Sequence, residues 1–263
     1  MKITIIGAGN MGGAIAVGLG YGSIIKPADI VCADKSQDAL VKIKAIHPAV
    51  QTATDNVAAI KDADIVVLAV KPWLIGAVCD EIRENLDYER QIIVSIAGGV
   101  ALDDLDGYLK SKKGASPVIF RIIPNTAVAV RQSMTFIASR RASQQSIDLL
   151  EKIFSELGDT MVVEERLLGA ATSLSSCGIA YAFRYIRAAM EGGVELGFYP
   201  VQAKDIILQT LRGAVELMTA NKSHPEEEID KVTTPGGMTI RGLNEMENAG
   251  FTAAVIRGLR ANR

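Results

Sequence analysis

Lys2-Ile-Thr-Ile-Ile-Gly-Ala-Gly-Asn-Met-Gly12 is the stretch that decides the fold of the N-terminal half. Its isoleucine-rich beginning predicts a short β-strand, and a helical pattern follows the glycines at Ala14–Leu19. A strand, a Gly-x-Gly-x-x-Gly run and a helix in this order are typical of dinucleotide-binding proteins. We expect Gly7 to make the tight turn, Gly9 to let the backbone approach a pyrophosphate, and Gly12 to let the helix pack closely on the strand.

The rest of this half alternates between strand-like and helical patterns. Strand-like runs occur at Ile30–Ala33, Ile65–Val70, Ile92–Ser95, Val118–Ile123 and Met134–Ala138. Helical patterns between them include Ala39–Ile46, Leu74–Asn85 and Leu102–Leu109. Strands separated by helices predict βαβ units, and therefore an α/β fold with a doubly wound, parallel, Rossmann-type sheet.

Small or polar residues follow the predicted strands at the edge of the sheet where ligands bind. These turns are Gly7–Gly12, Asp34–Ser36, Ala69–Pro72, Ala97–Gly99 and Pro124–Thr126. Each turn alone could be an ordinary surface turn. Because the carboxyl ends of parallel strands share one edge, five such turns favour a cofactor cleft.

The residues after the second strand leave the choice between NAD and NADP open. A carboxylate at Asp34 accepts hydrogen bonds from the ribose hydroxyls and repels a 2′-phosphate, unless its side chain turns out to solvent. Lys35 and Ser36 could instead hold that phosphate. Asn56 fits either a contact to the adenine or ribose or a helix cap. We therefore expect both reduced cofactors to work, without a strong preference.

Only helical patterns remain in the second half, after a helix at Ser143–Leu157 and a strand at Thr160–Val163. They cover Glu165–Leu196, Val201–Ala220, Met238–Asn248 and Thr252–Ala261. The sequence thus predicts a dinucleotide-binding domain over residues 1–163 and an all-α domain over residues 164–263. A helical domain with so many apolar residues would expose much apolar surface in a single chain. This favours its burial against a second copy in a homo-oligomer.

The run Lys231-Val-Thr-Thr-Pro-Gly-Gly-Met-Thr239 predicts an anion site in the helical half. Pro235 ends the preceding element, because proline has no N–H to donate. A helix then begins at Met238, so its free N–H groups and positive dipole end point at one spot. A carboxylate or phosphate suits that spot, beside the Thr239 hydroxyl. The same residues also fit an ordinary capped helix after a tight turn.

Composition argues against several other classes. The net charge is −2 and no segment is strongly basic, so neither nucleic acid nor an anionic membrane is an expected partner. Cys32, Cys79 and Cys177 form no CxxC pair, and His47 and His224 each precede a proline, so we expect no metal site and no disulfide framework. The apolar start is too short for a signal peptide, and we expect a cytoplasmic protein.

Together, these motifs resemble the pyrroline-5-carboxylate reductase family over essentially the whole chain. The runs that carry the resemblance are Ile6–Gly12, Ala69–Pro72, Arg121–Thr126 and Val232–Thr239. The resemblance implies an N-terminal Rossmann-type domain, an all-α C-terminal dimerisation domain, and dimers or assemblies of dimers. It also implies an oxidoreductase of proline biosynthesis, which transfers hydride from NADPH or NADH to the cyclic imine 1-pyrroline-5-carboxylate to give L-proline.

The resemblance also implies site residues at matching positions. The cofactor would contact Gly7, Ala8, Gly9, Asn10, Met11, Gly12, Asp34, Lys35, Ser36, Asn56, Ala69, Val70, Lys71, Pro72, Ile96, Ala97 and Gly98. The substrate would contact Glu165, Lys231, Thr234, Gly236, Gly237, Met238 and Thr239. Thr239 is the catalytic candidate, which either donates a proton to the ring nitrogen or only orients the ring.

One run departs from the family pattern. The usual Ser-Gly-Ser-Gly-Pro-Ala-Tyr reads Ser175-Ser-Cys-Gly-Ile-Ala-Tyr181 here, so Ser176, Cys177 and Ile179 replace glycine, serine and proline. Because the proline is missing, we expect a straighter helix at this point and a slightly altered pocket.

Two other functions compete with this interpretation. One is a β-hydroxyacid dehydrogenase, a family with similar architecture that carries a catalytic lysine on its long helix. No lysine occurs between Lys152 and Lys204, which disfavours that function. The other is a non-catalytic dinucleotide sensor whose helices bind a partner.

Overall fold

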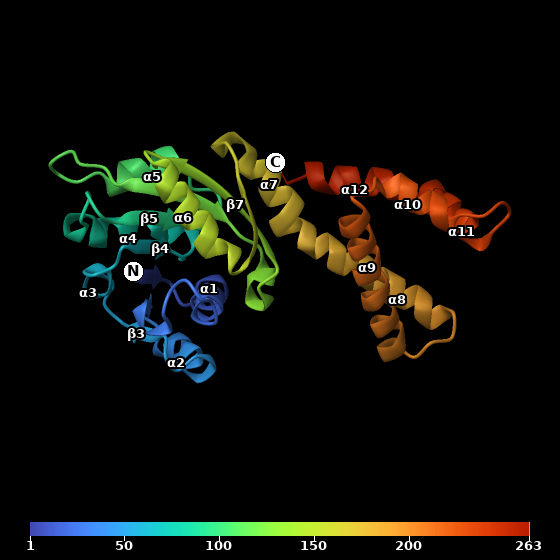
Figure 1. The fold of residues 1–263 in the computed structure, drawn as a ribbon, viewed down its shortest axis with the longest axis horizontal. Coiled ribbons are helices and arrows are strands. Elements are labelled where there is room, and N and C mark those ends of the chain that lie inside the picture. Colours follow the sequence, from blue (N-terminus) through green and yellow to red (C-terminus); the bar gives the residue numbers. More distant parts are fainter. Residues whose placement is uncertain (263) are drawn as a thin grey trace. The chain divides into compact units, whose positions relative to one another are not determined.

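The computed structural model describes residues 1–262 of the chain. They form two compact units, one over Met1–Ser176 and the other from Cys177 onward (Figure 1). The sequence places the division earlier, after Val163. In the structure, Leu168 and Ala171 are buried in a core cluster of the first unit, so the chain between the two boundaries packs with that unit.

The first unit contains an eight-stranded sheet with the strand order β3-β2-β1-β4-β5-β6-β7-β8. The strands are β1 Ile3–Ile6, β2 Ile30–Ala33, β3 Gln51–Ala53, β4 Ile65–Leu68, β5 Ile92–Ser95, β6 Val118–Ile123, β7 Ser133–Arg140 and β8 Gly158–Val162. All neighbouring pairs are parallel except β6 with β7, so β7 and β8 run opposite to the other strands. This arrangement confirms the predicted Rossmann-type, doubly wound fold.

Helices cover both faces of the sheet. One face is covered by α1 Asn10–Gly20, α2 Gln37–Ile46 and α6 Gln144–Ser155, and the other by α3 Asn56–Ile60, α4 Ile75–Ile82, α5 Leu102–Leu109 and α7 Leu168–Ala171. Each buried strand supplies both cores, because successive side chains point to opposite faces. In β1, Ile3 and Ile5 join the first core cluster and Ile6 joins the second.

Short 3₁₀ turns connect several of these elements. They are η1 Pro27–Asp29, η2 Pro72–Leu74, η3 Arg83–Asn85, η4 Thr126–Val130 and η5 Glu165–Leu167. The helix predicted over Leu74–Asn85 is thus a regular α-helix only in its middle, where it forms α4, and a 3₁₀ turn lies on each side of α4.

The long helix predicted over Glu165–Leu196 is not continuous. A π-helical segment, η6 Thr172–Cys177, separates α7 from α8 Gly178–Glu195. The predicted helix is therefore irregular at the departure from the family run, and the expectation that it is straighter there stays a prediction. The hydroxyls of Ser175 and Ser176 donate to the backbone oxygens of Met134, at 3.2 Å, and Pro124, at 2.9 Å. These hydrogen bonds to β7 and to the residue after β6 stabilise a π-helical conformation that the local sequence pattern does not predict.

The second unit consists of helices only. They are α8, α9 Pro200–Asn221, α10 Pro225–Val232, α11 Met238–Asn248 and α12 Phe251–Arg260. The α8 and α9 helices lie against each other (Figure 1), and a side chain at Gly193 would come within 2.9 Å of Ala203. The hydroxyl of Tyr181 on α8 donates to the carbonyl oxygen of Gly258 on α12, at 3.2 Å.

This helical unit has almost no core of its own in a single chain. Among its described residues, Ala203 is the one buried apolar residue. Side chains such as Leu196, Tyr199 and Val201 are between 65% and 82% exposed. Within residues 1–262, no helix combines the length and the apolar composition needed to cross a membrane.

Candidate active site

A cleft of about 820 Å³ opens where β1, β4, β5 and β6 end. It is lined by Gly7, Gly9, Asn10, Met11, Ala14, Asp34, Ala69, Val70, Lys71, Pro72, Leu74, Ile96, Ala97, Gly98, Thr126, Val128 and Ala129. The structure thus brings together four of the five strand-end turns at one edge of the sheet, and Asp34 from the fifth. Of the candidate cofactor residues, Ala8, Gly12, Lys35, Ser36 and Asn56 do not line this cleft.

The glycine-rich turn has the geometry that a dinucleotide requires. Gly7 has a φ of 109°, and a Cβ there would lie 2.6 Å from the carbonyl oxygen of Ala69. A Cβ at Gly12 would lie 2.0 Å from the carbonyl oxygen of Gly7, so α1 packs directly on the turn. Nothing lies within 4 Å of a Cβ built on Gly9, which leaves space on the cleft side.

The first turn of α1 is free to bind an anion. No side chain caps the helix at Gly9, and its first turn holds no acidic residue. Free N–H groups at a helix N-terminus bind phosphate groups well, because the helix dipole favours negative charge there. The open space at Gly9, these N–H groups and the cleft volume together fit the pyrophosphate of a dinucleotide.

Asp34 is fixed by two backbone hydrogen bonds. Its Oδ2 accepts from the N–H of Ala8 at 2.6 Å, and its Oδ1 accepts from the N–H of Ser36 at 2.8 Å. The carboxylate therefore faces the glycine-rich turn and does not turn out to solvent. Ser36 caps α2 with its hydroxyl, which accepts from the N–H of Ala39, and Lys35 is exposed.

A second cavity, of about 310 Å³, lies on the β2 side of the turn. It is lined by Ile6, Gly7, Ala33, Asp34, Lys35, Asn56, Val70, Leu74, Ala77, Val78 and Glu81. The cap of α3 is Asp55, which accepts from the N–H of Ala58, so the alternative role of Asn56 as a cap is wrong. Instead, the buried Asn56 donates from Nδ2 to Oε2 of Glu81 at 3.1 Å.

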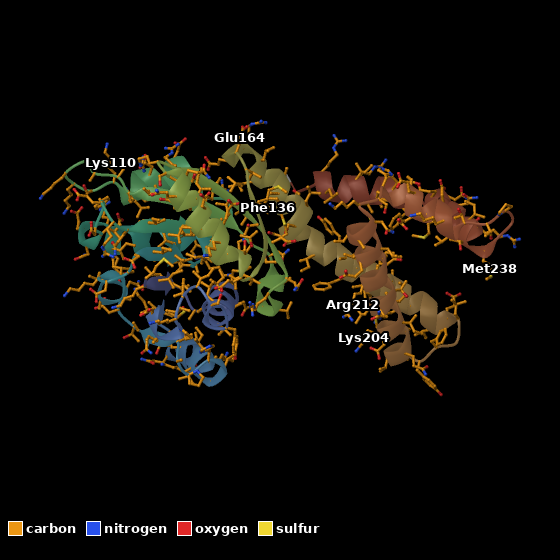
Figure 2. The ribbon with its side chains drawn as sticks, in the orientation of Figure 1. Lys110, Phe136, Glu164, Lys204, Arg212 and Met238 are labelled. Atoms are coloured by element: carbon orange, nitrogen blue, oxygen red, sulfur yellow. The ribbon has the colours of Figure 1, made fainter. Side chains whose placement is uncertain are left out.

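The candidate substrate loop precedes α11 in the second unit. Gly236 has a φ of 72°, and the N–H of Gly237 donates to the carbonyl oxygen of Thr234 at 2.9 Å. No side chain caps α11 at Gly237, so the first N–H groups of the helix are free. Met238 and Thr239 are exposed, and Figure 2 shows Met238 at the start of α11, beside the loop.

Sequence reasoning missed a cation beside this loop. Arg241 donates from Nη2 to the carbonyl oxygen of Gly236 at 2.9 Å. A guanidinium one turn into α11 adds positive charge at the end where the helix dipole is also positive. The loop therefore suits a carboxylate better than the glycines and the threonine alone suggest.

Lys231 and Glu165, the two other candidate substrate residues, have different environments. Lys231, on α10, donates from Nζ to Oε1 of Glu228 at 2.7 Å. This contact, helped by Ser223 and Asn221, lowers the pKa of Glu228 to about 2. Glu165 belongs to the first unit, whereas Lys231 and the loop belong to the second.

Glu165 joins three elements of the first unit. Its Oε1 accepts from the N–H of Leu102, the first residue of α5, at 2.6 Å and from Nη1 of Arg121 at 3.1 Å. The Arg121 side chain on β6 is only 14% exposed. Arg121 lies within a run that carries the family resemblance, but nothing in the local pattern indicates its partner.

The π-helical segment supports another wall of the cleft. Asn125 accepts from the N–H of Ala127 at 2.9 Å and donates from Nδ2 to the hydroxyl of Ser175, also at 2.9 Å. Ser176 donates to the carbonyl oxygen of Pro124. These bonds fix the start of η4, whose Thr126 lines the cleft.

Metal ligands do not gather in the described part of the chain. Within residues 1–262, no group of three or more His, Cys, Asp or Glu side chains is placed to hold a metal ion. The groups around the cleft are instead backbone amides, a carboxylate and a lysine, which suit a nucleotide.

The fold and the cleft define a dinucleotide-binding, Rossmann-type protein with a helical C-terminal unit. One family model, described as NADP oxidoreductase coenzyme F420-dependent, matches residues 2–99. A second, described as pyrroline-5-carboxylate reductase dimerisation, matches residues 165–263. The second match begins close to the boundary predicted after Val163, whereas the compact units divide after Ser176, so the functional boundary stays a prediction.

Known proteins match over nearly the whole chain. Pyrroline-5-carboxylate reductase 1 of Dictyostelium discoideum is 37% identical over 269 residues, which cover 98% of this chain but only 48% of that protein. Pyrroline-5-carboxylate reductase 2 of the same organism is 33% identical over 271 residues, covering 98% of this chain and 89% of that protein. The chain therefore spans about half the length of the first relative and most of the second.

Solved structures agree. The Plasmodium falciparum pyrroline carboxylate reductase with NADP bound has a TM-score of 0.88 and 26% identity, covering 100% of this chain and 95% of that one. The chain belongs to the pyrroline-5-carboxylate reductase family.

Proposed function

We propose that this protein reduces 1-pyrroline-5-carboxylate to L-proline, a step of proline biosynthesis, with NADPH or NADH as the hydride donor. The observation that carries the proposal is the dinucleotide cleft at the strand ends, in a chain that matches this reductase family along its whole length. The predicted cofactor residues support it, since most of them line one of two adjoining cavities.

Within this proposal, the residues of the first unit bind and orient the cofactor. The turn Gly7–Gly12 and the start of α1 bind the pyrophosphate, and Asp34 accepts hydrogen bonds from a ribose. Ala69–Pro72 and Ile96–Gly98 form the walls of the larger cleft. Ala8, Gly12 and Ser36 do not line the cleft. They support the cofactor site indirectly, because the amides of Ala8 and Ser36 fix Asp34 and Gly12 packs on the turn.

The residues of the second unit bind the substrate. The free amides of Met238 and Thr239, with Arg241 beside them, are proposed to hold the carboxylate, and the Thr239 hydroxyl is proposed to hydrogen-bond the ring nitrogen. When bound, the reduced nicotinamide would supply a hydride to the imine carbon, which becomes C5 of proline. Reduction is easiest for the protonated iminium, so the protein mainly orients the ring and stabilises its charge. Glu165 and Lys231 are also proposed to contact the substrate.

The direct test is an assay of cofactor oxidation. The protein, NADH or NADPH and 1-pyrroline-5-carboxylate should together lose the absorbance of the reduced nicotinamide, with L-proline as the product. A β-hydroxyacid dehydrogenase would instead oxidise 3-hydroxy acids with the oxidised cofactor. A non-catalytic sensor would bind the cofactor and turn over neither substrate. Absence of turnover with the imine would contradict the proposal.

Thr239→Val is expected to lower kcat/KM for 1-pyrroline-5-carboxylate by roughly two- to tenfold, and more if a charged ring nitrogen loses its partner. Valine keeps the shape of threonine but removes the hydroxyl. Cofactor affinity, measured by titration, should not change. The matched control is Thr233→Val, because the Thr233 hydroxyl bonds only to the backbone of Asp230. Full activity of Thr239→Val would remove this residue from the mechanism.

The protein is expected to be a dimer or an assembly of dimers. Residues 165–263 match a dimerisation family, and the apolar side chains of the helical unit are largely exposed in a single chain. Sedimentation at micromolar concentration should show at least a dimer; a stable, active monomer would contradict this. We also propose that it acts in the cytoplasm, which cell fractionation would test.

A further inference from the structure

Glu81, on α4, lies at the rim of the smaller cavity and belongs to none of the sequence motifs. Its Oε2 accepts a hydrogen bond from Nδ2 of Asn56, a residue that is 5% exposed at the start of α3. Only the amide nitrogen of an asparagine can donate to a carboxylate. Glu81 therefore fixes which way the Asn56 amide points.

The strand order indicates what the smaller cavity holds. In the sheet, β2 and β3 lie on one side of β1, and β5 and β6 lie on the other side, beyond β4. The larger cleft extends toward β5 and β6, and the smaller cavity extends toward β2, while Gly7 and Asp34 line both. A dinucleotide with its pyrophosphate at Gly7–Gly12 would therefore place its adenosine in the smaller cavity. This step rests on the proposed function.

The charged side chains around this cavity are Asp34, Glu81 and Lys35, two carboxylates and one ammonium. The Asp34 carboxylate cannot turn away without losing both of its backbone hydrogen bonds. NADPH would bring a 2′-phosphate with a charge of about −1.5 to −2 into this surrounding. The phosphate would meet two negative groups, which a single flexible lysine does not neutralise.

The hydrogen-bonding groups of Asn56 also favour a ribose hydroxyl over a 2′-phosphate. Glu81 takes one of the two amide protons of Asn56, which turns the carbonyl oxygen of Asn56 away from Glu81 and leaves this oxygen and the second N–H for a ligand. A ribose hydroxyl and the adenine amino group can both donate to such an acceptor, whereas an ionised phosphate cannot. We infer that Glu81, acting with Asp34 and through Asn56, is a specificity-determining residue that makes this site favour NADH over NADPH.

The test compares two ligands that lack the nicotinamide, ADP-ribose and 2′-phospho-ADP-ribose, by titration calorimetry at low salt. The native protein should bind ADP-ribose more tightly. Glu81→Gln keeps the size of the side chain and a partner for Asn56 but removes the charge. It should shift the ratio of the two Kd values toward the phosphorylated ligand by about three- to tenfold, and the shift should shrink at high salt.

Asp80→Asn is the matched control. Asp80 is the neighbouring residue on α4, pairs with Arg83 at 2.8 Å and lines neither cavity. The Asp80→Asn substitution also removes one negative charge, and it should leave the ratio of the two Kd values unchanged. Equal shifts in both variants, or no shift in Glu81→Gln while ADP-ribose still binds, would overturn the inference. If imine reduction fails but Glu81→Gln still shifts the ratio, the proposed reaction is wrong and the inference about Glu81 stands.

Discussion

Gly12→Ala is expected to abolish dinucleotide binding and to lower the free energy of unfolding by about 1–3 kcal/mol, the usual range for an overpacked site. The new Cβ would lie 2.0 Å from the carbonyl oxygen of Gly7 and 2.8 Å from the Cβ of Ala69. Neither atom belongs to a flexible side chain, so α1 would have to move away from the turn. The turn would then lose the shape that leaves space at Gly9.

Gly13→Ala provides the control, one residue further along α1. A Cβ there meets the carbonyl oxygen of Ala8 at 3.4 Å and the Ile43 side chain at 3.7 Å, which are ordinary contacts. Because alanine also favours helix, this variant should be at least as stable as the native protein. Trp73, the only tryptophan, lies between two cleft residues, Pro72 and Leu74, so its fluorescence can report NADH binding. Native-like binding by Gly12→Ala would contradict the close packing of α1 on the turn.

Glu165→Ala is expected to lower the free energy of unfolding by about 2–4 kcal/mol, somewhat less than for a fully buried ion pair because both side chains keep some exposure. The change leaves the guanidinium of Arg121, which is 14% exposed, without its carboxylate. It also leaves the N–H of Leu102 without an acceptor at the start of α5. Denaturant unfolding with a fixed m-value would measure the loss.

A double variant separates the two roles proposed for Glu165. Replacing the ion pair by apolar residues, with Glu165→Leu and Arg121→Met together, should recover much of the lost stability, because no buried charge remains unpaired. If Glu165 also binds substrate, the recovered protein should still show a raised KM for 1-pyrroline-5-carboxylate. An unchanged stability of Glu165→Ala would show that the ion pair with Arg121 contributes little to the fold.

The local sequence was sufficient wherever an element is bounded by its own residues. The strands Ile30–Ala33, Ile92–Ser95 and Val118–Ile123 have the predicted bounds, because β-branched runs there end at turn residues. The helix Met238–Asn248 begins directly after its glycines, as predicted. Most of the candidate cofactor residues also line a cavity, since parallel strands bring their carboxyl ends to one edge.

Elements without an apolar pattern of their own were missed. The β3 strand is short and partly exposed, and it exists because Val31–Ala33 of β2 offers it a parallel partner. The α10 helix has an acidic first turn and no buried residue, so its pattern gives no hydrophobic face.

The sequence by itself determined the class of fold, the cofactor edge of the sheet and the family. Only the tertiary structure decided the direction of Asp34, the clamp of Glu81 on Asn56, and the π-helical segment held by Ser176. Each of these depends on a hydrogen bond between residues far apart in the chain. A local pattern of apolar residues indicates which face of a helix or strand is buried. It does not indicate which polar groups from distant parts of the chain will form hydrogen bonds with that element.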